Sequence, residues 1–235
     1  MLKLECPIPT EEVNIATRIV MRRKGCTQAQ ALGLTAAIKQ RLMEACPNNL
    51  RGKRDRALLD VGYDTLCRRS ELVMLKIENL SIDADGSGQV LVRQLKSIQY
   101  GEIRKAYLSV ETMGHLQDWL RASGLDSGPI FRAIKCGAPT RDALNPYSVT
   151  AILKRLAAAA GLDRCVVEGL SSHSLRVGAA QDMAAAGIDL VAIMHAGGWR
   201  TPQKVMRYTE HMDVRYSGMA RLHAKSGILG NHEPA

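Results

Sequence analysis

The chain has 235 residues, of which 46% are apolar and only 4% aromatic, and its net charge at pH 7 is +9. This length allows one large or two small domains, and the excess of positive charge points to a polyanionic partner, most simply nucleic acid. No apolar run approaches the ~18 residues that span a bilayer and the acidic N-terminus lacks a signal peptide's basic start, so we expect a soluble, cytoplasmic protein.

Helical periodicity is the dominant pattern in the chain. It predicts helices over about residues 11–24, 35–45, 52–80, 111–122, 147–160, 172–186 and 189–196, another from Pro202, and an amphipathic segment over 214–224. Several boundaries carry their own signals. Gly187 ends one helix, Ser171 or Ser172 can cap another, and Thr201 and Pro202 begin a third.

Two β-type runs interrupt the helices after the turn-rich segment 83–88. They cover Gln89–Leu95 and Ile103–Val110, and the polar residues between them predict an antiparallel ribbon that carries Lys96. Residues 123–145 are expected to be irregular. The fold class is therefore α+β, mainly α-helical, with a small antiparallel ribbon or sheet.

Three parts are expected along the chain. Residues 1–34 form an N-terminal helix and linker, residues 35–226 form the main domain, and the tail 227–235 is disordered.

The residues that could carry chemistry begin with His173 and Arg176, which lie three apart and share one helix face. The planar guanidinium of an arginine suits a phosphate, and a histidine exchanges a proton near neutral pH. Taken alone, such a pair is more often part of a capped surface helix with incidental polar residues.

Trp199 and Tyr208 follow at short range. The indole N–H of Trp199 is a single fixed donor, although a buried tryptophan is also an ordinary core anchor. A tyrosine pKa near ~10 leaves little phenolate at neutral pH, so Tyr208 could act as a nucleophile only with a nearby base and nearby arginines. An isolated tyrosine is more often a core or surface residue.

Upstream, Arg68 is followed three residues later by Glu71, which can hold its guanidinium if the arginine turns inward. The neighbouring Arg69 fits a solvated charge pair better. Lys96 on its ribbon would be an ordinary surface lysine in most proteins.

In this order, the residues of segments 54–80 and 171–222 resemble the tyrosine recombinase (phage integrase) family. Within that family, the stretches most similar to the Cre-type branch are 172–183, 193–199 and 205–208. The resemblance extends over about residues 15–225 and implies a tyrosine recombinase catalytic fold. It also implies that residues 1–34 are the remnant of a helical core-binding domain.

The resemblance implies a role for each of these side chains. The catalytic residues would be Arg68, Lys96, His173, Arg176, Trp199 and Tyr208, with Glu71 as a supporting carboxylate. Tyr208 would attack a DNA phosphate and Lys96 would protonate the leaving oxygen. No cofactor and no metal is implied, and the six cysteines are scattered without metal-ligand spacing.

The implied partner is double-stranded DNA, bound by a homotetramer that assembles through the helix 214–224. Position and charge suggest DNA contacts from Arg132, Lys135, Arg141, Tyr147 and Ser148. Two alternatives to a site-specific recombinase stay open at this point: a type IB topoisomerase, which shares the constellation, and a DNA-binding regulator that keeps the fold without cleavage.

Overall fold

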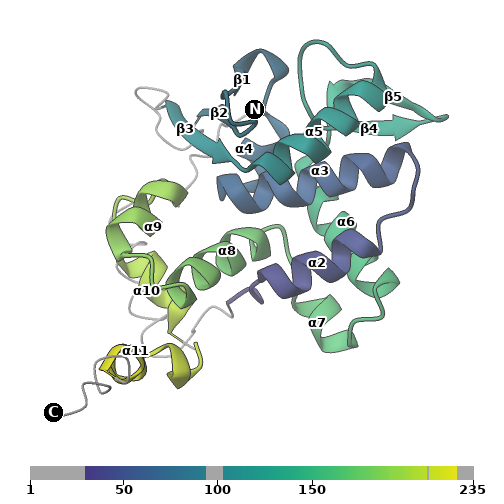
Figure 1. The fold of residues 1–235 in the computed structure, drawn as a ribbon. Helices are drawn as coiled ribbons and strands as arrows, with labels where there is room; N and C mark the ends of the chain where they lie inside the picture. Colours follow the sequence, from purple (N-terminus) through teal and green to yellow (C-terminus); the bar gives the residue numbers. More distant parts are fainter. Residues whose placement is uncertain (1–29, 94–102, 211, 227–235) are drawn as a thin grey trace, which may run out of the picture. The chain divides into compact units, whose positions relative to one another are not determined.

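The computed structural model describes residues 30–93, 103–210 and 212–226 (Figure 1). The elements among them are α2 (Ala36–Glu44), α3 (Leu50–Thr65), α4 (Arg69–Val73), η1 (Ile77–Asn79), β1 (Leu80–Ile82), β2 (Gly88–Arg93), β3 (Ile103–Leu108), α5 (Val110–Ser123), β4 (Arg132–Lys135), β5 (Ala138–Ala143), α6 (Pro146–Ala159), α7 (Arg164–Gly169), α8 (Ser174–Ala185), α9 (Leu190–Gly197), α10 (Gln203–Thr209), η2 (Val214–Tyr216) and α11 (Gly218–Ser226). The predicted helix at 11–24, Lys96 and the tail 227–235 lie outside the described residues.

The predicted fold class is confirmed, because the described residues are mainly helical and form two small antiparallel sheets. The first sheet has the order β1–β2–β3, with Leu80 opposite Val90 and Gly88 opposite Leu108. Its central and third strands are the predicted ribbon. None of the helices in the described part of the chain is long and apolar enough to cross a membrane.

The single helix predicted over residues 52–80 is wrong. The chain leaves the helix at Leu66, whose φ of 49° is left-handed, and Arg68 then caps the short helix α4. A leucine adopts this left-handed backbone conformation only when interactions with the rest of the fold stabilise it. The hold is tertiary, because the guanidinium of Arg176 donates to the Leu66 carbonyl.

The irregular stretch predicted over 123–145 is also wrong, because it contains the hairpin β4–β5. Its two-residue turn is Cys136-Gly137, and both residues have positive φ, as a type I′ turn requires. The helix α7 is likewise absent from the prediction. Other boundaries shift by one or two residues: α8 is capped by His173 rather than by a serine, α10 starts after Pro202, and the segment 214–224 divides into η2 and α11.

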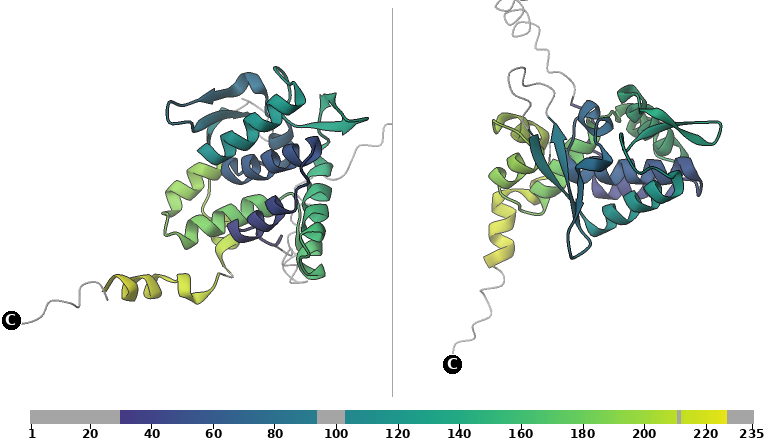
Figure 2. Two further views of the ribbon diagram at one scale, coloured as in Figure 1. Left: turned by 45° about the vertical axis from the view of Figure 1, so that its right-hand side comes forward. Right: turned by 90° about the horizontal axis from the view of Figure 1, so that it is seen from above.

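Helix α3 lies between two groups of elements (Figures 1 and 2). The first sheet, α4 and α5 lie on one side, and α8 with α9 and α10 on the other. The main core is filled on the first side by residues such as Trp119, whose indole N–H donates to the Ile130 carbonyl at 2.9 Å. A second apolar cluster holds α8, α9 and α10 together, and it consists of Leu66, Val177, Ala179, Ala180, Ile193, Trp199, Val205 and Tyr208.

The chain entering α2 packs backbone to backbone against α8. The Leu34 amide donates to the Ser174 carbonyl at 2.9 Å, and a Cβ added to Gly178 would lie 1.9 Å from the Leu34 carbonyl oxygen. A carboxylate on the same helix, Asp182, accepts from the Ala36 amide at 2.6 Å. These contacts fix α8 against residues 33–36.

Candidate active site

The candidate site begins with a direct contact between two helices. The Nε2 atom of His173, at the start of α8, lies 2.6 Å from the phenol oxygen of Tyr208 on α10. Tyr208 is only 8% exposed because its ring belongs to the second apolar cluster. The apolar packing of α10 therefore aims the phenol at the imidazole.

Trp199 and Arg176 lie next to the His173–Tyr208 contact. The Trp199 ring meets the Tyr208 ring edge to face at 5.8 Å, and the guanidinium carbon of Arg176 lies 4.9 Å from the Trp199 ring centre. Gly198, with a φ of 62°, ends α9 and turns the chain into Trp199. A cation over an indole face is favourable, so the tryptophan helps to hold the arginine.

Arg176 is 1% exposed. Its guanidinium donates to two main-chain carbonyls, those of Leu66 and, at 3.2 Å, Gly197. Its Nε is buried without a hydrogen-bond partner among the described residues. A buried charged donor left unpaired costs free energy, so this N–H is suited to donate a hydrogen bond to an anion's oxygen.

Arg68 is held by the carboxylate that the sequence predicts. Its guanidinium and its main-chain amide, the latter at 2.9 Å, both donate to Glu71. The Glu71 side chain is almost fully buried, whereas 30% of the Arg68 side chain is exposed. The arginine is thus fixed in direction but open to a ligand.

Burial and positive charge set the protonation of the site. Desolvation, followed by the charges of Arg176 and Arg68, lowers the pKa of His173 to about 4, although one side of this residue is exposed. Burial raises the pKa of Tyr208 even though Arg176 opposes that shift. Burial, then Arg68, lowers the pKa of Arg176 to about 10. At neutral pH the imidazole is therefore neutral, the phenol is protonated and the arginine is charged.

The structure thus brings most of the predicted catalytic residues together. His173, Arg176, Trp199 and Tyr208 are joined by direct contacts, and the charge of Arg68 acts on three of them. Such a group offers a nucleophile, a neutral acceptor for its proton and two cations for an oxyanion.

Comparison with known proteins agrees with this geometry. Residues 34–215 match the model of the Phage integrase family. The chain belongs to the phage integrase family. It is 27% identical over 243 residues to the recombinase Cre of Escherichia phage P1, which covers 94% of this chain and 71% of Cre. The family expected from the motifs is confirmed.

Two further relatives of this integrase-family chain match it over a smaller share of their own length. An integrase/recombinase XerD homologue of Selenomonas ruminantium is 31% identical over 172 residues, covering 70% of this chain and 49% of the relative. The XerH recombinase, solved bound to a palindromic difH substrate, matches with a TM-score of 0.63 at 19% identity, over 86% of this chain and 54% of XerH. The chain spans about half the length of these two relatives, and the XerH likeness shows the shared fold.

The residues predicted to contact DNA lie in different settings in this family member. Lys135 and Arg141 are exposed on the hairpin β4–β5. Arg132 instead turns its guanidinium to the main-chain carbonyls of Ser127 and Pro129.

At the start of α6, Tyr147 is 71% exposed, and the guanidinium carbon of Arg69 lies 4.4 Å from its ring centre. Its neighbour Ser148 is half-buried. The Arg69–Tyr147 pair therefore lies one residue from Arg68, which places a predicted DNA contact beside the candidate site.

Two residues that sequence reasoning missed also support the site. Gln181 donates to the main-chain carbonyl of Tyr208 at 3.0 Å. Arg104 on β3 donates to the carbonyls of Thr65 and Ala196, at the ends of α3 and α9. Arg104 lies on a strand without a local motif, whereas Gln181 lies within the stretch 172–183, where no spacing singles it out. Only the fold brings both side chains to the site.

One group among the described residues could hold a metal ion. The ligand atoms of Asp60, Glu111 and His115 lie within 4.8 Å of one another. Both oxygens of Asp60 are already engaged, one by the ammonium of Lys39 and the other by Nδ1 of His115, each at 2.6 Å. The lysine supplies the positive charge that this buried carboxylate needs, so we interpret the group as a structural ion-pair network.

Proposed function

We propose that this chain is the catalytic domain of a site-specific DNA recombinase that cleaves and rejoins DNA through a covalent link to Tyr208. The observation that carries the proposal is the 2.6 Å contact between His173 Nε2 and the Tyr208 phenol in a site that also holds two arginines. Cre and the XerD homologue are named recombinases, and XerH was solved bound to a palindromic difH substrate, which supports double-stranded DNA as the substrate. The two relatives come from a bacteriophage and a bacterium, so we place this chain in the bacterial cytoplasm.

The proposed step is an in-line displacement at phosphorus. The Tyr208 oxygen attacks the scissile phosphate while its proton passes to the neutral His173 imidazole. The bond from phosphorus to the 5′-oxygen breaks, which leaves a 3′-phosphotyrosyl link, and Lys96 protonates the departing oxygen. Because the phosphotyrosyl bond keeps the free energy of the broken diester, attack by a 5′-hydroxyl reverses the step and needs no ATP.

The arginines and the tryptophan act on the phosphate oxygens. Negative charge builds up on the two non-bridging oxygens, and fixed cations stabilise it most when water is excluded. Arg68 has the exposure to reach one oxygen, and Arg176 has an unpaired Nε for the other. Trp199 donates its indole N–H to the phosphate.

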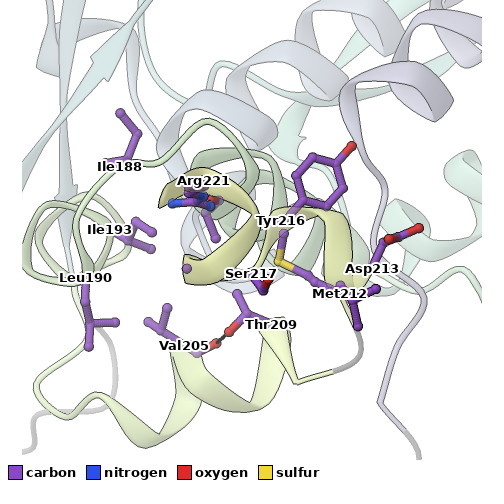
Figure 3. A pocket seen from close by; sticks show the side chains of 13 residues that line it. Ile188, Leu190, Ile193, Val205, Thr209, Met212, Asp213, Tyr216, Ser217 and Arg221 are labelled. Atoms are coloured by element: carbon purple, nitrogen blue, oxygen red, sulfur yellow. Dashed lines mark hydrogen bonds between the residues drawn. The ribbon is translucent and has the colours of Figure 1, made fainter. Parts of the chain in front are cut away.

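We also propose that four protomers assemble through residues 214–224. A cavity of about 430 Å³ is lined by residues of α8, α9, α10 and the segment 212–221, with apolar side chains that include Ile188, Leu190 and Ile193 (Figure 3). Helix α11 of the same chain borders this cavity, and its Arg221 donates to the Ala184 carbonyl. Val214 and Met219 are 80% and 62% exposed, which supports a role for this segment in contacts with a second copy.

Covalent trapping tests the chemical proposal. A pool of nicked duplexes with randomised sequence loses a short 5′-hydroxyl fragment on cleavage, so the enzyme stays attached and is detected on a denaturing gel. We expect an adduct with the wild type and none with Tyr208→Phe. The control Tyr107→Phe changes an exposed tyrosine on β3 and should form the adduct. An adduct with Tyr208→Phe, or none with the wild type, would refute the proposal.

The assembly proposal has a separate readout. Met219→Asp places a charge on α11, and it should abolish complexes that hold two DNA duplexes in a native gel while leaving adduct formation intact. Unchanged two-duplex complexes would contradict assembly through this segment.

The topoisomerase and non-cleaving regulator are not favoured, since the named relatives are recombinases and the described catalytic contacts are intact.

A further inference from the structure

Two helix ends converge on the site, and each one directly precedes a catalytic side chain. Helix α3 ends at Thr65, three residues before Arg68. Helix α9 ends at Gly197, two residues before Trp199. The relative placement of Arg68 and Trp199 therefore depends on how these two ends are held together.

Two arginines hold these helix ends together, and each arginine donates to one main-chain carbonyl at the end of α3 and to one at the end of α9. Arg176 donates to the carbonyls of Leu66 and Gly197. Arg104, which comes from β3, donates to the preceding carbonyl in each case, that of Thr65 and, at 3.1 Å, that of Ala196. The two guanidiniums thus bridge the same two chain segments at consecutive residues.

The chemistry of helix ends explains why cations lie here. The last carbonyls of a helix have no intrahelical partner and carry the negative end of the helix dipole. In α9 the earlier carbonyls of Met194 and His195 are taken by the amides of Trp199 and Gly198. The last two carbonyls of that helix are left for the two arginines. The bridge therefore satisfies carbonyls that would otherwise be buried without donors.

The two arginines differ in what else they must do. Under the proposed function Arg176 donates to the scissile phosphate, so its donors are shared between that phosphate and the bridge. Arg104 donates to the two carbonyls and to the Cys67 sulfur, the latter at 3.7 Å, and under the proposed function it has no phosphate to bind.

We propose that Arg104 is a positioning residue that keeps the ends of α3 and α9, and so Arg68 and Trp199, in register while Arg176 engages the phosphate. This inference rests on the proposed function. Two properties make arginine suitable: its guanidinium spans two acceptors at once and stays charged when half-buried. A lysine ammonium is a point charge on a flexible stem and would serve the two carbonyls less well.

Single-turnover cleavage of a trapped DNA sequence tests the proposal, with DNA affinity and melting temperature measured in parallel. For Arg104→Ala we expect the maximal cleavage rate to fall by about 10²-fold, the loss that a misplacement of catalytic groups by about 1 Å produces. DNA affinity should stay within about threefold of wild type, because the change acts on the placement of the reacting groups. The cleavage rate of Arg104→Lys should lie between those of wild type and Arg104→Ala. The matched control Arg121→Ala removes an exposed arginine of α5 and should cleave as wild type does.

Chemical rescue separates positioning from a loss of folding. Guanidinium chloride at millimolar concentration, compared with sodium chloride at equal ionic strength, should raise the cleavage rate of Arg104→Ala at least fivefold, since the cation can occupy the emptied place between the carbonyls. Wild type and Arg121→Ala should not respond.

Wild-type cleavage by Arg104→Ala or Arg104→Lys would overturn the inference. So would a loss explained entirely by DNA affinity, or a loss that guanidinium does not restore. A wild-type enzyme that forms no adduct would instead refute the proposed function itself, so the two failures are distinguishable.

Discussion

The Nε2 atom of His173 lies 2.6 Å from the Tyr208 phenol oxygen. The burial that raises the Tyr208 pKa leaves the phenol protonated at neutral pH, whereas the lowered His173 pKa leaves the imidazole free to accept that proton. The pair therefore has its proton donor and acceptor in place for the proposed cleavage.

The first prediction concerns pH. The pKa of His173 is about 4 in the folded protein against ~6.5 when unfolded, so the unfolded chain binds more protons between these values. The free energy of unfolding should therefore decrease as pH falls from 6.5 toward 4, and His173→Gln should weaken this dependence. Urea titrations at a series of pH values measure it, and NMR titration of the ring should give a pKa well below 6.5. A ring that titrates at 6.5 would contradict the prediction.

The second prediction concerns Lys96, which lies outside the described residues. If Lys96 is the general acid, Lys96→Ala should slow cleavage of ordinary DNA by about 10²-fold or more. A substrate with sulfur in the 5′-bridging position has a better leaving group that needs no proton, so the variant should cleave it close to the wild-type rate. Absence of that rescue would remove Lys96 from this role.

The third prediction concerns Glu71. Its almost fully buried carboxylate holds both the guanidinium and the amide of Arg68, so Glu71→Ala should lower the free energy of unfolding by about 1–3 kcal/mol and slow cleavage. Glu71→Gln keeps one acceptor and should lie between. Denaturant unfolding and single-turnover cleavage provide the measurements. Equal activity of the alanine variant and wild type would show that Arg68 is positioned by other contacts.

The fourth prediction concerns the packing of α8. Gly178→Ala would place a methyl group 1.9 Å from the Leu34 carbonyl oxygen, and we expect a loss of about 1–3 kcal/mol of stability, together with slower cleavage. The matched control is Gly114→Ala within α5, where an added Cβ meets no atom within 4 Å. That change should stabilise the protein by about 0.5–1 kcal/mol. Thermal or urea unfolding distinguishes the two, and a neutral Gly178→Ala would contradict the close contact.

The fifth prediction separates two kinds of DNA contact. Arg141 is an exposed cation on the hairpin, so Arg141→Ala should reduce the slope of log affinity against log salt by about one unit if it meets a phosphate. Tyr147→Ala removes an exposed ring stacked on Arg69 and should weaken binding without changing that slope. Fluorescence anisotropy between low and moderate salt gives both numbers. Identical slopes for Arg141→Ala and wild type would exclude a phosphate contact there.

Much of the helical order follows from periodicity and end signals, because those are local properties. Gly187, which follows the end of α8, and Pro202, which precedes α10, are examples. The break at Leu66 has no local signal, because a leucine takes a positive φ only under the tertiary hold of Arg176. The hairpin β4–β5 escapes prediction because its strands are short and irregularly paired, with a shift in register after Arg132.

The candidate site shows the same division. His173, Arg176, Trp199 and Tyr208 lie within 36 residues of one another in the printed sequence, and the family resemblance of this stretch indicates their chemistry. Arg104 is distant in sequence from the helix ends that it bridges, and its neighbours on β3 are unremarkable for a strand. A residue that acts only on main-chain carbonyls leaves no side-chain pattern for a motif to reveal.

The backbone contact between Leu34 and Gly178 links the position of residues 33–34 to the position of helix α8 and of the candidate site. His173 caps helix α8, Arg176 lies in its first turn, and Gly178 follows two residues after Arg176. Because these contacts are between main chains, a displacement of residues 33–34 would move α8 directly. The position of Leu34 would thus affect His173, the residue that contacts the proposed nucleophile.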